Sequence, residues 1–122
     1  MSISKLMTKP VLRIADDATI QEAVEIMGKE DISTLLVTRH GRDVGILTAG
    51  DVISKVVAKK KDLDTVRVKD VMSVPLITID KKMSGEDALR MMVKHDVRRL
   101  LITDDDEIVG IFTTSDITKL VP

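Results

Sequence analysis

Hydrophobic and polar residues follow the same order twice along the chain. Each half begins with a short apolar stretch that predicts a β-strand, with proline at the start, where a missing N–H is tolerated. Apolar residues at helical spacing follow, and two alternating stretches separated by polar turns then predict two more strands. The predicted strands are 10–14, 34–38 and 44–47 in the first half and 75–79, 99–103 and 108–112 in the second.

Capping motifs predict where the first helix of each half begins. Thr19-x-x-Glu22 and Ser84-x-x-Asp87 both have the spacing of a capping box, in which two side chains satisfy the first free N–H groups. A second helix closes each half, from about residue 50 to 59 and from about 115 to the chain end. The order strand, helix, strand, strand, helix predicts an α/β fold.

The two halves are copies of one another. A shift of 65 positions aligns residues 3–57 with 68–122 without a gap, and sixteen of the 55 pairs are identical. We therefore predict repeat 1 at 1–57, a linker at 58–67 and repeat 2 at 68–122, all within one module. A unit of about 55 residues buries little surface alone. We expect the two repeats to pack sheet to sheet with pseudo-twofold symmetry.

Composition argues against several classes of protein. The net charge of −1 disfavours a general nucleic-acid binder, and Phe112 as the single aromatic residue removes base stacking. The absence of cysteine excludes disulfides and zinc–thiolate sites. No run of 18 apolar residues and no signal-type N-terminus is found, so we expect a cytoplasmic protein without membrane contact.

No motif in the sequence predicts catalysis. Neither His40 nor His95 has a second histidine at metal-ligand spacing, so we expect no metal site. No glycine-rich phosphate loop or activated serine motif is found, and we expect the protein not to be an enzyme. The lack of asparagine and the single glutamine, Gln21, hint at a thermophilic source.

A Thr-x-x-Asp motif opens each closing helix, as Thr48 with Asp51 and Thr113 with Asp116. An ionised carboxylate accepts two hydrogen bonds from the adjacent hydroxyls of a ribose, and the threonine hydroxyl lies one turn away. The alternative is structural, because the same spacing forms a capping box. The two interpretations are compatible, since threonine can cap the helix while aspartate faces a ligand.

The motifs at residues 45–51 (GILTAGD) and 110–116 (GIFTTSD), with 5–10 (KLMTKP) and 69–75 (KDVMSVP), resemble the CBS-domain family. The resemblance covers the whole chain as a CBS pair, or Bateman module. It implies a homodimer that binds AMP, ADP, ATP or S-adenosylmethionine as a regulatory ligand in clefts between the repeats. It implies action in trans on a partner protein and no required cofactor. The alternative is a ligand-free scaffold for interaction or dimerisation.

The same resemblance implies two sets of site residues. One cleft would combine Ile111, Thr113 and Asp116 with Pro10, Val11, Leu12, Ile32 and Ser33. Its mirror would combine Ile46, Thr48 and Asp51 with Pro75, Leu76, Ile77, Val97 and Arg98. The aliphatic residues would enclose a purine.

An arginine pair distinguishes the two repeats at the start of their second strand. Repeat 2 has Arg98 and Arg99 where repeat 1 has Ser33 and Thr34. Guanidinium groups bind phosphate through paired hydrogen bonds, so we expect Arg98 and Arg99 to contact a ligand phosphate. The alternative is that both are solvated or pair with Asp96 and the acidic turn at 104–106.

Overall fold

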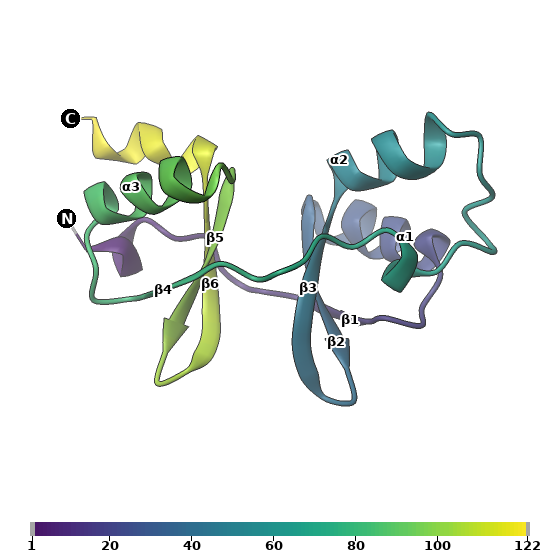
Figure 1. The fold of residues 1–122 in the computed structure, drawn as a ribbon, viewed down its shortest axis with the longest axis horizontal. Coiled ribbons are helices and arrows are strands. Elements are labelled where there is room, and N and C mark those ends of the chain that lie inside the picture. The colour runs from purple at the N-terminus through teal and green to yellow at the C-terminus, as the bar shows by residue number, and fades with distance from the viewer. Residues whose placement is uncertain (1, 122) are drawn as a thin grey trace. The chain divides into compact units, whose positions relative to one another are not determined.

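The computed structural model describes residues 2–121, which form two compact units. The continuous unit is Leu12–Leu76. The split unit combines the residues up to Val11 with those from Ile77 onward. The chain therefore passes from one unit to the other twice, and both ends of the chain belong to the split unit (Figure 1).

The continuous unit contains one three-stranded sheet in the order β1-β2-β3. Strand β1 is parallel to β2, and β2 is antiparallel to β3. The helices α1 and α2 lie on the same side of this sheet (Figure 1). The elements are β1 Arg13–Ala15, α1 Ile20–Glu30, β2 Thr34–Arg39, β3 Arg42–Thr48, α2 Ala49–Val52, the π-helix η2 Ile53–Val57 and the 3₁₀ helix η3 Val68–Asp70.

The split unit repeats this architecture. Its sheet has the order β4-β5-β6 with the same parallel and antiparallel pairings. Even the register irregularity recurs, at Val37/Thr38 in one sheet and Ile102/Thr103 in the other. The α/β fold and the predicted order of elements are confirmed. The elements are the 3₁₀ helix η1 Ile3–Lys5, β4 Thr78–Asp80, α3 Gly85–His95, β5 Arg99–Asp104, β6 Glu107–Thr113 and the 3₁₀ helix η4 Thr114–Leu120.

The first strand of each repeat begins later than predicted. Pairing starts at Arg13 and Thr78, three residues after each proline. The closing helices also differ from simple α-helices. The first continues from α2 into a π-helix, and the second is a 3₁₀ helix in which threonine and other β-branched residues disfavour the α-helix.

The caps of the first helices are only partly as predicted. Ser84 and Asp87 form the full capping box of α3, and the bonds from the Ser84 backbone and side chain lower the pKa of Asp87. Thr19 instead makes the forward bond alone, accepting from the amide of Glu22 at 3.1 Å. Both helices nevertheless begin where the motif predicts.

Each unit has its own core, and part of that core comes from the other repeat. We call residues 3–11 and 68–76 the leading segments, because each precedes the first strand of a repeat. Ile3 and Leu6 are buried in the core of the split unit, and Val68 and Val71 in that of the continuous unit. Each leading segment therefore packs with the body of the other repeat, and the two are exchanged relative to the sequence.

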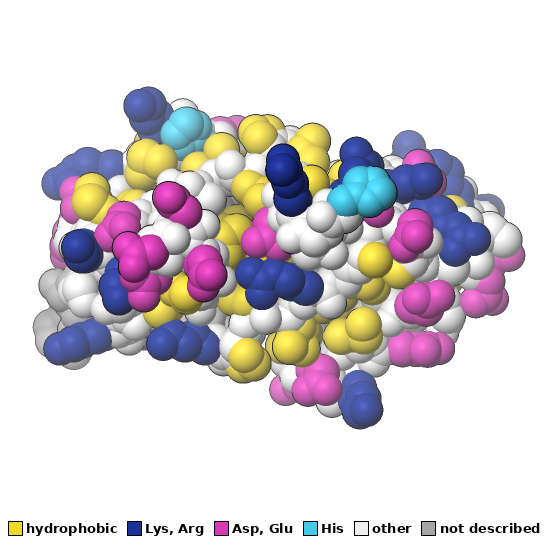
Figure 2. Space-filling view, turned by 90° about the horizontal axis from the view of Figure 1, so that it is seen from below, with side chains coloured by type: hydrophobic (Ala, Val, Ile, Leu, Met, Phe, Trp, Pro, Cys, Tyr) yellow, Lys and Arg dark blue, Asp and Glu magenta, His cyan; other side chains and the backbone are white. Residues whose placement is uncertain are grey.

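The surface mixes charges of both signs. Acidic and basic side chains both occur on the face shown in Figure 2, and the sequence has nearly equal numbers of each. Within residues 2–121, no helix has the length and apolar character needed to cross a bilayer.

Candidate functional site

The Thr-x-x-Asp motifs lie where β3 meets α2 and where β6 meets η4, and both form capping boxes. Asp51 accepts a hydrogen bond from the Thr48 amide at 3.1 Å, and Thr48 Oγ1 accepts one from the Asp51 amide at 3.0 Å. Asp116 accepts from the Thr113 amide at 2.9 Å. The structural interpretation of these motifs is therefore confirmed, and the carboxylates are fixed at the start of each closing helix.

Each carboxylate also accepts a hydrogen bond from a hydroxyl of a leading segment. Ser73 Oγ lies 3.2 Å and 3.3 Å from the two oxygens of Asp51. Thr8 Oγ1 lies 3.3 Å and 3.4 Å from those of Asp116. Thr8 and Ser73 are 65 positions apart in the sequence, so the two units contain the same contact.

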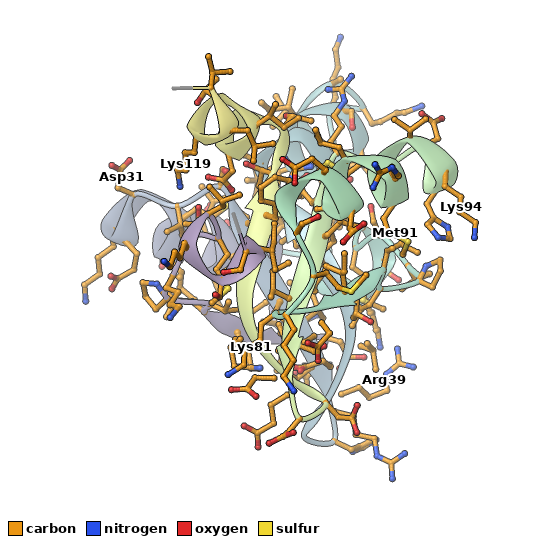
Figure 3. The ribbon with its side chains drawn as sticks, turned by 90° about the vertical axis from the view of Figure 1, so that its left-hand side faces the viewer. Asp31, Arg39, Lys81, Met91, Lys94 and Lys119 are labelled. Atoms are coloured by element: carbon orange, nitrogen blue, oxygen red, sulfur yellow. The ribbon has the colours of Figure 1, made fainter. Side chains whose placement is uncertain are left out.

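A lysine completes each group of contacts. Lys55 Nζ lies 3.1 Å from Asp51 Oδ1 and donates to the Val71 carbonyl at 3.0 Å. Lys119 Nζ lies 2.8 Å from Asp116 Oδ1 and donates to the Leu6 carbonyl at 2.9 Å. Figure 3 shows Lys119 reaching from η4 toward the N-terminal segment. Each ammonium thus connects a carboxylate to a leading segment.

The two lysines are not equivalent in the repeat alignment. Lys55 follows its aspartate by four residues, whereas Lys119 follows by three. A 3₁₀ helix turns once every three residues, so it brings the third residue to the face that the fourth reaches in a wider helix. The different winding of the closing helices therefore compensates for the different lysine position.

Both carboxylates are largely shielded from solvent. The side chain of Asp116 is 6% exposed and that of Asp51 is 13% exposed. A carboxylate at such depth needs donors for its lone pairs and a positive partner. The capping amide, the hydroxyl and the lysine provide them, so each unit holds its carboxylate at a defined position.

The leading segments pair with the strands that carry the glycine motif. Thr8 exchanges two backbone hydrogen bonds with Ile111, of 2.8 Å and 3.1 Å, and Ser73 exchanges two with Ile46, of 2.8 Å and 3.0 Å. The backbone groups of Ile46 and Ile111 are thus already used. Only their side chains remain for the predicted contact with a purine.

The predicted site residues fall into both units, because the chain passes from one unit to the other after Val11 and after Leu76. The split unit holds Pro10, Val11, Ile77, Val97, Arg98, Arg99, Ile111, Thr113 and Asp116. The continuous unit holds Leu12, Ile32, Ser33, Ile46, Thr48, Asp51, Pro75 and Leu76. Within each unit the Thr-x-x-Asp motif lies beside the leading segment that contains the predicted proline. The sharing of a ligand by both repeats stays a prediction.

The arginine pair has an unusual environment. Arg98 is exposed, and its carbonyl accepts from the Thr114 amide at 3.1 Å. The Nε of Arg99 is buried and has no hydrogen-bond partner. Within residues 2–121, neither arginine forms an ion pair with Asp96 or the acidic turn. A buried donor without a partner is rare in folded proteins and calls for a partner such as water or an ion.

Sequence reasoning gave no role to four residues of this network: Thr8, Ser73, Lys55 and Lys119. The repeat alignment contains a signal for the hydroxyls, because it pairs threonine with serine. It contains none for the lysines, since it pairs Lys55 with Leu120 and Lys119 with Ser54.

A separate open hollow of about 530 Å³ lies in the split unit. It is lined by Ser2, Ser4, Met7, Lys9, Lys81, Lys82, Asp104 and Val109, and none of these is a predicted site residue. Lys81 already pairs with Asp104 at 2.9 Å, and this contact raises the pKa of Lys81. Among the described residues, no cluster of three or more histidine or acidic side chains is arranged to hold a metal ion.

Comparison with known proteins accounts for the repeated architecture. The pattern of the CBS domain matches residues 3–58 and again residues 68–122. The chain belongs to the CBS-domain family. Its predicted membership as a tandem CBS pair is confirmed, and the Thr-x-x-Asp motifs occupy the same place in both CBS repeats.

Two protein sequences illustrate how far the likeness extends. The CBS domain-containing protein YhcV of Bacillus subtilis is 34% identical over 116 residues, which are 95% of this CBS pair and 82% of YhcV. An uncharacterized protein of Methanocaldococcus jannaschii is 31% identical over 120 residues, which are 96% of this chain. The CBS pair spans 64% of the length of that archaeal protein.

Two solved structures share the fold. A hexameric CBS-CP12 protein from bloom-forming cyanobacteria has a TM-score of 0.88 and 30% identity, covering 97% of this chain and 69% of its own. A CBS domain pair in complex with 5′-methylthioadenosine and S-adenosyl-L-methionine has a TM-score of 0.82 and 28% identity. The matched region covers 98% of this chain and 94% of the chain in that complex.

Proposed function

We propose that this CBS pair is a regulatory module that binds an adenosine-containing ligand and acts on a partner protein rather than catalysing a reaction. The observation that carries the proposal is the shielded carboxylate at the start of each closing helix, Asp51 in one unit and Asp116 in the other. A fixed, ionised carboxylate suits the two neighbouring hydroxyls of a ribose. A related CBS pair in complex with two adenosyl compounds supports this ligand class.

Thermal unfolding with AMP, ADP, ATP and S-adenosylmethionine tests the proposal. A ligand at 100 times its dissociation constant should stabilise the fold by about 2.7 kcal/mol. Asp51→Asn and Asp116→Asn should each remove the gain due to one site, because an asparagine oxygen can still accept from the amide of Thr48 or Thr113 but carries no charge. The measurement is the ligand-dependent shift in Tm for each variant.

Asp87→Asn is the matched control, since Asp87 also belongs to a capping box but lies at the start of α3. Its ligand response should equal that of the wild type. If none of the four compounds shifts the Tm of the wild-type protein, the scaffold alternative holds instead.

The arginine pair predicts a preference for phosphorylated ligands. Replacing Arg98 and Arg99 together by alanine should weaken AMP binding about tenfold, because a hydrogen bond between charged groups contributes about 1.5 kcal/mol or more. Adenosine binding should change little. Titration calorimetry with both ligands measures the difference, and equal losses for AMP and adenosine would exclude contact with phosphate.

Assembly is part of the same proposal. We expect a homodimer, and the hexameric state of the related CBS-CP12 protein supports self-association within this fold. The adenosyl ligand would act through that assembly or through the surface offered to a partner, which requires different affinities for two states. The cytoplasmic location likewise stays a prediction.

A further inference from the structure

We infer that the hydroxyls of Thr8 and Ser73 are internal substitutes for a hydroxyl of the ligand. Each hydroxyl donates to the carboxylate that would accept from a ribose hydroxyl. A bound ligand displaces the hydroxyl of Thr8 or Ser73 from that carboxylate. This inference rests on the proposed function. It adds that ligand binding at a carboxylate changes the contacts of a leading segment.

The contacts of Ser73 and Thr8 are longer than those of the capping amides and the lysines, and only the Thr113 hydroxyl, 3.4 Å from Asp116 Oδ2, lies as far from its carboxylate among the described partners. Ser73 and Thr8 lie 3.2–3.4 Å from the carboxylate oxygens, and each is shared between both oxygens. A well-formed hydrogen bond from a hydroxyl to a carboxylate is about 2.5–2.7 Å long. These contacts are therefore weak and are the first that an incoming hydroxyl can replace.

The capping amide and the lysine of each carboxylate are held more firmly. The capping amides lie 2.9 Å and 3.1 Å from the carboxylates, and their positions are fixed by the helix start. Each lysine is anchored twice, because it also donates to a carbonyl of the leading segment. A ligand can thus exchange one hydroxyl for another while the carboxylate keeps its charge, its cap and its lysine.

The exchange would loosen a leading segment without detaching it. Ser73 would keep its two backbone bonds to Ile46, and Thr8 would keep its two to Ile111. Each leading segment ends where the chain passes to the other unit, after Val11 and after Leu76. Ligand binding at a carboxylate is thereby communicated to the stretch of chain that joins the units.

The test removes each hydroxyl and keeps its carboxylate. Thr8→Val and Ser73→Ala should each tighten AMP binding at one site about threefold to tenfold, because the internal competitor is gone. Ser73→Thr, which restores a hydroxyl, should bind with wild-type affinity. Ser54→Ala is the matched control, since the Ser54 hydroxyl lies in the same region but donates to the Gly50 carbonyl at 2.9 Å. Titration calorimetry gives the dissociation constants.

Hydrogen exchange supplies a second readout. AMP should speed exchange of the Ser73 amide in the wild type, whereas in Ser73→Ala this amide should exchange faster before any ligand is added. Weaker or unchanged AMP binding in both Thr8→Val and Ser73→Ala would overturn the inference and leave the proposed function standing. A wild-type protein that binds none of the four adenosyl compounds would remove both.

Discussion

Gly45→Val should destabilise the protein by about 3 kcal/mol, because there is no room for a side chain where the leading segment crosses β3. A Cβ atom at Gly45 would lie 2.9 Å from the backbone oxygen of Ser73 and 3.0 Å from Met72 Sδ. The backbone of the leading segment cannot move aside without losing its two hydrogen bonds to Ile46. The free energy of unfolding in urea measures the effect.

Two further glycines make this prediction specific. Gly28 lies on an exposed turn of α1, and a Cβ atom added there would have no neighbour within 4 Å, so Gly28→Val should change stability by about 0.5 kcal/mol or less. At Gly110 the neighbour is the side chain of Met7, which is flexible and can adjust. Gly110→Val should fall between the two. Equal effects at Gly28 and Gly45 would contradict the role of close backbone contact.

Asp116→Ala should also destabilise the protein by about 3 kcal/mol. Asp116 is the third residue of the capping box and accepts from the Thr113 amide, and the loss of hydrogen bonds to a charged group costs roughly 1.5–3 kcal/mol. The variant leaves Lys119 without its carboxylate and the Thr113 amide and Thr8 hydroxyl without their acceptor. Urea unfolding again gives the measurement.

Two control variants separate the effect of the hydrogen bond to the Thr113 amide from the effect of the carboxylate charge. Asp116→Asn keeps an acceptor at the cap and should lose only about half as much stability. Asp17→Ala removes an exposed carboxylate and should change stability by about 0.5 kcal/mol or less. If Asp116→Ala were as mild as Asp17→Ala, the carboxylate would have no structural role and its contacts would be dispensable.

The sequence was sufficient for the order of elements because that order depends on local patterns. Alternating strands and capping motifs depend on neighbouring residues, and the repeat alignment shows the same local pattern twice. These patterns predict the α/β architecture and the places of Asp51 and Asp116 at the start of the closing helices. The start of β1 was missed by a few residues, since the pattern shows apolar character but not which backbone groups find partners.

The exchange of the leading segments could not be predicted from the pattern. Ile3 and Leu6 are apolar at the same spacing as Val68 and Val71, so either segment fits either core by composition. The contacts of Lys55 and Lys119 with the carboxylates could not be predicted for a different reason. Lys55 and Lys119 reach equivalent positions only because one closing helix is wound more tightly than the other, and winding is not visible in a gapless alignment.

The exchanged leading segments also constrain how such a chain can arise. One repeat alone would lack the apolar residues that fill its core, since its own leading segment is built to fill another copy. A single-repeat ancestor of this design would therefore be a domain-swapped pair of identical chains. Tandem duplication would fuse that pair into one polypeptide through the segment 58–67, and each chain crossing would correspond to the swapped segment of one ancestral chain.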